Sequence, residues 1–116
     1  MLSARYRFHR RNHVARVHKK GRSVRSGSLA LKYVLGNSKD IKVAVIVSKK
    51  VAKSAVTRNR IRRRVFELVR NHFERLPEGF EGIVSVYGVE AAKMPSDELK
   101  AHILELFDRA GLKLKE

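Results

Sequence analysis

Apolar residues recur along this chain with two different periods, which predicts both strands and helices. Residues 28–35 alternate between apolar and polar positions, and the apolar face carries Leu29, Leu31, Tyr33 and Leu35. Residues 41–47 are rich in β-branched side chains and predict a strand that is covered on both faces. Because only a turn cluster at residues 36–40 separates the two segments, they predict an antiparallel hairpin. Residues 82–87 predict a further strand.

A long amphipathic helix is predicted between the second and third of these strands. It is expected to begin between Ser54 and Thr57 and to run to about Leu76, where Pro77 and Gly79 end it. Its apolar stripe has a period of 3.6 residues and consists of Ile61, Val65, Leu68, Val69, His72 and Leu76. The residues that fall away from the stripe are Asn59, Arg60, Arg63, Arg64, Glu67 and Arg70. The helix should therefore pack on a sheet and present a cationic face near its N-terminal end.

A second helix is predicted after the last strand. Ser96 is its expected N-cap, and Asp97 and Glu98 fall in the first turn, where negative charge suits the helix dipole. Gly111 is the expected C′ residue. The buried stripe of this helix consists of Leu99, Ile103, Leu106, Phe107 and Ala110. Helices against one small sheet indicate an α+β fold, a two-layer sandwich.

The N-terminal 25 residues contain nine basic residues and no acid. Val14 and Val17 would form the inner edge of a short helix there, which ends near Gly21. The chain has no internal repeat, low-complexity tract or long linker, and its length suits one core. Residues 1–116 are therefore expected to form a single domain.

Charge identifies the class of partner. The formal net charge is +16, which exceeds what solubility requires. Residues 1–65 hold 20 basic residues and one acid, Asp40, whereas residues 66–116 hold 7 basic and 10 acidic residues. This asymmetry predicts one surface that faces a polyanion, with nucleic acid as the first candidate.

Composition also excludes several classes of protein. The chain has no cysteine, which excludes disulfides, thiolate zinc sites and cysteine nucleophiles and suits a reducing cytosol. Its basic N-terminus lacks the apolar run of a signal peptide. The longest unbroken apolar run, residues 43–47, is far below the ~20 residues that cross a bilayer. A cytoplasmic protein without a membrane partner is expected.

The strongest candidate for chemistry is the segment of residues 48–64, which reads SKKVAKSAVTRNRIRRR. It contains eight basic residues and no acid, and it follows a predicted strand directly. Arg58 and Arg60 flank Asn59 in the first turn of the long helix, where free backbone N–H groups and the helix dipole also favour anions. Arginine grips phosphate oxygens through two hydrogen bonds, and lysine acts as a point charge. The segment therefore predicts a phosphate-binding surface.

The motifs SKKV and AVTRNRIRRR resemble the signature of the bacterial ribonuclease P protein family, in which SKK ends a strand and RNR opens the long helix. The resemblance covers nearly the whole chain. It implies an α-β-β-β-α-β-α order with a left-handed β-α-β crossover, similar to a domain of ribosomal protein S5, and so adds a fourth strand. It also implies an RNA-binding subunit of an endoribonuclease that removes the 5′ leader of precursor tRNA. No obligate protein partner is inferred.

The resemblance implies two RNA contacts. The surface for the catalytic RNA subunit is expected to consist of Ser48, Lys49, Lys50, Lys53, Arg58, Asn59, Arg60, Arg62 and Arg63. A cleft between the first helix and the sheet is expected to receive the single-stranded leader through stacking and cationic contacts. Its candidate residues are Val14, His18, Lys32, Tyr33 and Phe66. Val14 and His18 stand where the family usually has aromatics, and either Lys32 or Tyr33 takes the strand position that is usually Tyr, so weaker stacking is expected.

No catalytic residue is predicted in the chain itself. His9 and His13 are four residues apart but lack a third metal ligand, and no carboxylates are paired for acid–base chemistry. His72 lies on the apolar stripe and is expected to be a hydrogen-bonded core residue. The residues Phe66, Phe73, Phe80 and Phe107 are interpreted as core or core-edge. The resemblance assigns the chemistry to the RNA subunit, which would also hold most of the Mg²⁺.

Two other functions remain open from the sequence. A structural ribosomal protein would explain the composition equally well, but not the spacing from SKK to RNR. A basic DNA-binding module of the helix-turn-helix type needs a second helix packed close by, whereas the long basic helix here follows a strand and a loop.

Overall fold

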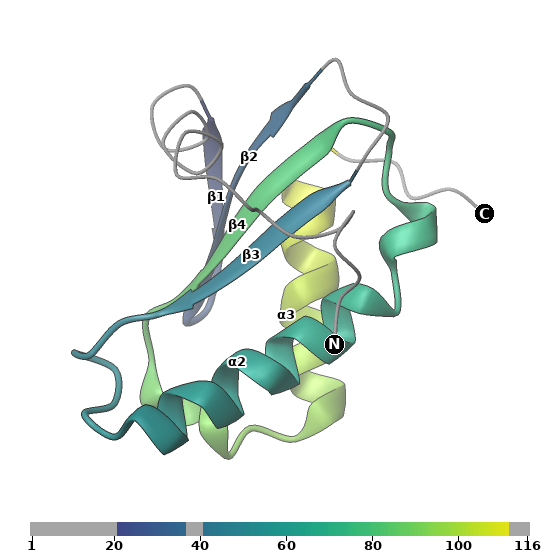
Figure 1. Cartoon of the computed structure of the whole chain (residues 1–116). Helices are drawn as coiled ribbons and strands as arrows, with labels where there is room; N and C mark the ends of the chain where they lie inside the picture. The colour runs from purple at the N-terminus through teal and green to yellow at the C-terminus, as the bar shows by residue number, and fades with distance from the viewer. Residues whose placement is uncertain (1–20, 37–40, 112–116) are drawn as a thin grey trace.

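The computed structural model describes residues 21–36 and 41–111. Within them, one four-stranded sheet carries two α-helices on the same face (Figure 1). The strands are β1 Arg22–Ser26, β2 Leu29–Leu35, β3 Lys42–Val47 and β4 Phe80–Val86, and the helices are α2 Ala55–Arg70 and α3 Ser96–Arg109. Two short 3-10 turns are η2 Phe73–Arg75 and η3 Val89–Ala92. The α+β class and the order β-β-β-α-β-α are as expected, and the short helix with Val14 and Val17 lies outside the described residues.

The strand order in the sheet is β1-β2-β4-β3. Strand β2 pairs antiparallel with both β1 and β4, and β3 runs parallel to β4. The predicted hairpin between residues 28–35 and 41–47 is therefore wrong, because β4 lies between these two strands. Six of the seven β4 residues are buried, which suits a strand with neighbours on both sides. The hand of the β3–α2–β4 crossover stays a prediction.

Strand β1 is the fourth strand that the resemblance implied. Its sequence, RSVRS, has one apolar residue and mostly exposed positions, so the apolar pattern carried no strand signal. It forms a hairpin with β2 across Gly27, whose φ of +57° is a conformation that favours glycine. An added Cβ at Gly27 would also lie 2.8 Å from the His102 ring.

Strand β3 lies at the edge of the sheet and is covered on one face only. Val43, Val45 and Val47 are buried against the helices, whereas Ala44 is half-buried and Ile46 is 39% exposed. The prediction that both faces are covered is therefore wrong. Leu35 lies on the predicted face by strand alternation but is 60% exposed, because it is at the end of β2, paired with the first residue of β4.

The core fills the space between the sheet and the two helices. Helix α2 contributes Ile61, Val65 and Val69. Helix α3 contributes Leu99, Ile103, Leu106 and Phe107. These are most of the two predicted stripes, with Leu68 and Ala110 only partly buried against the same core.

The start of α2 lies within the predicted range, whereas the end of α2 and the N-cap of α3 differ slightly from the predicted ones. Ser54 caps α2, with its Oγ accepting a hydrogen bond from the Thr57 N–H at 3.4 Å. Helix α2 ends at Arg70 rather than near Leu76, because the chain tightens into the 3-10 turn η2, which buries Phe73. Helix α3 begins at Ser96, and Pro95 rather than Ser96 occupies the N-cap position. Its end is as predicted, with Gly111 at φ +73°.

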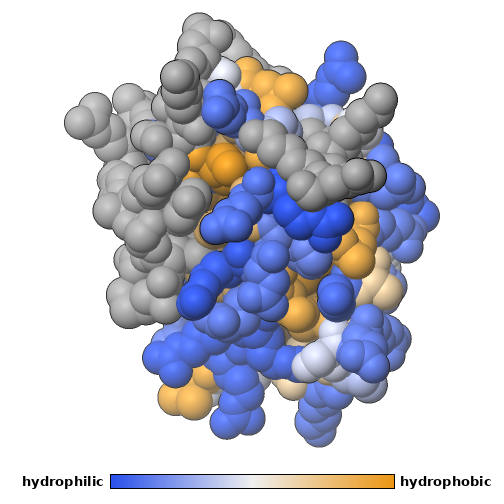
Figure 2. Space-filling view, turned by 90° about the vertical axis from the view of Figure 1, so that its right-hand side faces the viewer, coloured by the Kyte–Doolittle hydropathy of each residue, from blue (hydrophilic) through white to orange (hydrophobic). Residues whose placement is uncertain are grey.

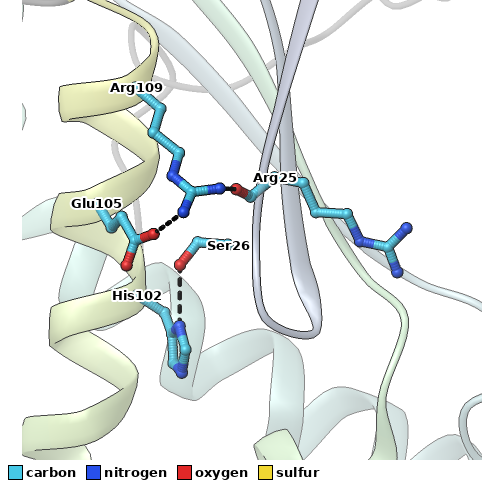
Figure 3. A network of polar contacts seen from close by, with 5 residues as sticks. All are labelled: Arg25, Ser26, His102, Glu105 and Arg109. Carbon is cyan, nitrogen blue, oxygen red and sulfur yellow. Dashed lines mark hydrogen bonds and ion pairs between the residues drawn. The ribbon is translucent and has the colours of Figure 1, made fainter.

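A polar network ties β1 to α3 (Figure 3). Ser26 Oγ and His102 Nδ1 share a hydrogen bond of 2.9 Å, and Ser26 is buried. The Arg109 guanidinium donates to the Arg25 carbonyl at 2.6 Å and also pairs with Glu105. The two hydrogen bonds between β1 and α3 join residues more than 70 positions apart, so the sequence alone gave no indication of them.

His72 follows the C-cap of α2 and is 6% exposed. Its burial is as predicted, but the expectation of a hydrogen-bonded ring is wrong: neither ring nitrogen has a partner in the part of the chain that the structure describes. Burial lowers the pKa of the His72 imidazole below its ordinary 6.5, and the nearby charges of Arg75 and Lys100 lower it further.

Replacing His72 with leucine should stabilise the fold, and more so in acid. Between the folded and unfolded pKa values only the unfolded chain takes up a proton, so the stability of the parent falls as the pH drops below about 6.5. Near pH 8 the free energy of unfolding of the His72→Leu variant should be higher than that of the parent by about 1 kcal/mol, because a buried polar ring without partners is removed. Urea titrations at pH 8 and pH 5.5 measure both values; a gain that does not grow at pH 5.5 would contradict the assignment.

Surface character is mainly hydrophilic on the side of the molecule shown in Figure 2, with smaller hydrophobic areas between the polar side chains. Among the described residues, neither α2 nor α3 combines the length and apolar character that spanning a membrane requires.

Candidate nucleic-acid interface

The basic segment leaves the sheet at the end of β3 and continues into α2. Ser48, Lys49, Lys50 and Lys53 are all exposed in the connection, and the Val51 N–H donates to the Ser48 carbonyl at 3.1 Å to close a turn. We call the basic surface the residues that the sequence assigned to RNA: Ser48, Lys49, Lys50, Lys53, Arg58, Asn59, Arg60, Arg62 and Arg63. All of them are exposed or half-buried. The structure therefore brings the two halves of the motif to one region.

Arg60 and Arg63 are the most available cations of this surface. Both are exposed and lie three residues apart on α2, so their side chains share one side of the helix. With Val56, Asn59 and Arg64 they line a shallow open groove of about 450 Å³. Neither makes a hydrogen bond or ion pair with another described residue. Two forked guanidinium groups beside an open groove can bind the oxygens of a phosphate backbone.

Other members of the basic surface hold the protein's own structure. The Arg58 Nη1 donates to the carbonyls of Ala52 and Lys53, at 2.9 and 2.8 Å, and so fixes the loop before α2. The Arg62 Nη1 donates to the Asn59 Oδ1 at 2.8 Å. These contacts preorganise the surface, because they fix the loop and the Arg62 side chain before any ligand binds.

Arg64 differs from the other arginines of the cluster. Its guanidinium donates to the Ala91 carbonyl at 2.7 Å and to the Met94 carbonyl, which ties α2 to the segment around η3. The Arg64 side chain was predicted to lie on the cationic face, away from the apolar stripe. That expectation is wrong for its guanidinium group, which binds these two carbonyls. The two carbonyls lie 27 and 30 residues away in sequence, so the helix pattern could not reveal them.

The described residues predicted for the leader cleft do not come together. Tyr33 is 9% exposed and points to the helices, where its hydroxyl donates to the Ala110 carbonyl at 2.8 Å and its ring stacks on Phe80. Phe66 packs against the same core from α2. Lys32 is half-buried and points to the opposite face, because successive strand residues alternate. Tyr33 and Phe66 thus lie on the helix side of the sheet and Lys32 lies on the opposite face. Val14 and His18 lie outside the described residues, so the composition of the leader cleft stays a prediction.

Two residues that the sequence reasoning missed lie at the end of the sheet where β3 leads into the basic surface. Tyr87 follows β4 and is 58% exposed, and the Arg25 guanidinium carbon lies 5.1 Å from the centre of its ring. The Tyr87 N–H donates to the Ser28 carbonyl at 2.7 Å, which anchors it beside the β1–β2 turn. An exposed aromatic at a strand end is a signal available in the sequence, but its arginine neighbour depends on the sheet order.

The described residues were also compared with the side-chain clusters that bind metal ions. The described ranges, residues 21–36 and 41–111, contain no group of three or more His, Asp or Glu side chains that could hold a metal ion. The basic surface itself is cationic and suited to binding phosphate.

Comparison with known proteins gives a consistent result. The family model for ribonuclease P matches residues 2–111. The ribonuclease P protein components of Pseudanabaena and of Symbiobacterium thermophilum are 34% and 36% identical to the chain, and the alignments cover 95% and 96% of both proteins. A solved structure of the RNase P protein from Staphylococcus aureus matches with a TM-score of 0.78, at 23% identity, over 100% of this chain and 98% of that one. At that identity the structural likeness concerns the fold.

Proposed function

The chain belongs to the bacterial ribonuclease P protein family, and from that premise we propose that it binds the catalytic RNA subunit and the 5′ leader of precursor tRNA. In this role it promotes endonucleolytic removal of the leader, which leaves the mature 5′ end of tRNA. The observation that carries the proposal is the basic surface at the junction of β3 and α2. Its open Arg60 and Arg63 stand on a framework that Arg58 and Asn59 fix in advance.

The proposed division of labour follows from the chemistry of the side chains. The basic surface supplies fixed cations without a nearby acid in residues 48–64, so it can neutralise phosphates where two RNA strands approach one another. Lys32, on the face of the sheet away from the helices, is the described residue that supports leader binding. No side-chain group among the described residues acts as a nucleophile or general base in this proposal.

Mg²⁺ belongs to the RNA in this proposal. The donor groups of the described residues do not fit a resident Mg²⁺ site, since no cluster of carboxylates is present there. The ion would be held mainly by the RNA subunit, which carries out the hydrolysis. The protein's cations would then lower the concentration of Mg²⁺ that RNA assembly requires.

Adding this protein should restore precursor-tRNA cleavage by a bacterial ribonuclease P RNA at Mg²⁺ concentrations too low for the RNA alone. The expected product ends at the mature 5′ position, which gel analysis of end-labelled precursor measures. An RNA subunit already shown to cleave at high Mg²⁺ serves as the control. Tight RNA binding without any rescue would contradict the proposal and favour a structural role on another RNA, such as a ribosomal one.

A further inference from the structure

The end of the sheet next to the basic surface is built from three separate segments. Val47, the last residue of β3, is paired with Val86, the last residue of β4, and Val86 is also paired with Leu29 at the start of β2. Tyr87 and Ser48, the residues that follow β4 and β3, therefore leave two neighbouring strands at the same end of the sheet. The β1–β2 turn completes the same end of the sheet. The SKK motif, Tyr87 and Arg25 thus lie at the same end of the sheet, although they are far apart in sequence.

Arg25 and Tyr87 point away from the helices. Their neighbours Ser26 and Val86 are buried on the helix side, so the alternation of strand residues sends Arg25 and Tyr87 to the other face. There the guanidinium of Arg25 lies over the Tyr87 ring at 5.1 Å. Tyr87 is 58% exposed, so much of its side chain faces solvent beside this guanidinium. The backbone of both residues is held, because the Arg25 carbonyl accepts from Arg109 and the Tyr87 N–H donates to Ser28.

We propose that Tyr87, backed by Arg25, is a stacking platform for an unpaired nucleobase of the bound RNA. An exposed aromatic ring on a rigid backbone, with a cation against it and a basic surface beside it, combines the stacking and electrostatic elements by which proteins hold single-stranded nucleic acid. This inference rests on the proposed function, since it places one further RNA contact at the edge of the same surface. It supplies a stacking ring at a position different from the predicted leader-cleft residues.

The neighbouring Glu90 favours a base over a phosphate at this spot. Its carboxylate accepts a hydrogen bond from the Ser28 hydroxyl, and this bond lowers the pKa of Glu90, so the group stays negative at neutral pH. A carboxylate repels a phosphate but tolerates a base, whose edge offers N–H donors. The platform therefore receives the base, and the phosphates on either side fall to the lysines and arginines of the basic surface.

Three substitutions at Tyr87 test the platform with full-length protein and the RNA subunit. Tyr87→Ala should weaken binding about fivefold to tenfold, the low end of the range for one stacked base. Tyr87→Phe keeps the ring and should bind like the parent. Because the chain contains no tryptophan, Tyr87→Trp introduces a single indole whose fluorescence should be quenched when RNA binds. Val89→Ala, an equally exposed apolar residue two positions later, is the matched control and should bind like the parent.

The source of the base can be separated in the same series. If Tyr87→Ala weakens binding of the RNA subunit alone, the base belongs to that RNA. If it instead reduces only the preference of the holoenzyme for precursor tRNA with a leader over leaderless tRNA, the base belongs to the leader. Either result supports the platform. Parent-like binding and preference in Tyr87→Ala, with no quenching in Tyr87→Trp, would overturn it while leaving the basic surface intact; a parent protein that binds neither RNA would overturn the proposed function itself.

Discussion

Replacing Arg60 and Arg63 together with alanine is expected to weaken binding of the ribonuclease P RNA about 100-fold at near-physiological salt. Each side chain is exposed beside an open groove and makes no hydrogen bond or ion pair with the other described residues, so each is available for a phosphate. A hydrogen bond to a charged group contributes about 1.5 to 3 kcal/mol, and two such contacts at the lower end correspond to the 100-fold change. Arg60→Ala alone should cost about tenfold.

Salt dependence distinguishes this loss from a general disturbance of the fold. Each phosphate contact contributes about −0.7 to −0.9 to the slope of log affinity against log salt, so the double variant should have a slope shallower by about 1.4 to 1.8. Filter binding at salt concentrations from about 50 to about 300 mM, where counterion release dominates, measures both the affinity and the salt slope. The Tyr87→Ala variant should leave the slope unchanged, because a stacked base releases no counterion.

Arg70 provides a matched control on the same helix. Arg70 is exposed, and its change to alanine removes one positive charge, as the change of Arg60 does. However, Arg70 lies at the far end of α2 and is paired with Glu67 at 3.4 Å. Arg70→Ala should therefore bind the RNA subunit within about twofold of the parent, since exposed pairs contribute little. Equal losses in Arg60→Ala and Arg70→Ala would mean that net charge, rather than the basic surface, determines affinity.

Arg64→Ala is expected to destabilise the fold by about 2 kcal/mol, which for a domain of this size lowers the melting temperature by roughly 8 °C. The side chain is half-buried, and its guanidinium satisfies the carbonyls of Ala91 and Met94. Without it these carbonyls lose their partner, and the link between α2 and the segment around η3 is broken. Calorimetry of the free protein measures the effect.

Arg63→Ala is the companion experiment for this prediction. The two arginines are adjacent in sequence and carry the same charge, but Arg63 is exposed and makes no hydrogen bond or ion pair with the described part of the chain. Arg63→Ala should melt within about 1 °C of the parent, as expected for an exposed position without special contacts. An Arg64→Ala variant that melts with the parent would show that the two carbonyl contacts do not stabilise the protein.

The relation between sequence and structure differs between the helices and the sheet. The stripe of Ile61, Val65 and Val69 predicted the buried side of α2 correctly, because helical periodicity is a local property that follows from 3.6 residues per turn. The partner of β3 was predicted wrongly, because strand pairing joins distant segments and the most buried strand, β4, takes the position between β2 and β3. The core face of β2 followed from local alternation in the same way, since Leu29, Leu31 and Tyr33 of the predicted apolar face are all buried.

The sequence alone determined that this chain has a basic half, a long amphipathic helix after an SKK motif, and the α+β class, because charge, period and motif spacing are written along the chain. Tertiary structure decided which arginines of α2 form hydrogen bonds within residues 21–36 and 41–111. Arg60 and Arg63 face an open groove. Arg64 is identical in chemistry and next in sequence, but it donates its hydrogen bonds to carbonyls that only the fold brings within reach. It also decided that Arg25 lies over Tyr87, a contact between residues 62 positions apart that depends on β2 lying between β1 and β4. Hydrogen bonds and ring contacts act over a few ångströms, so such pairs exist only after the chain has folded.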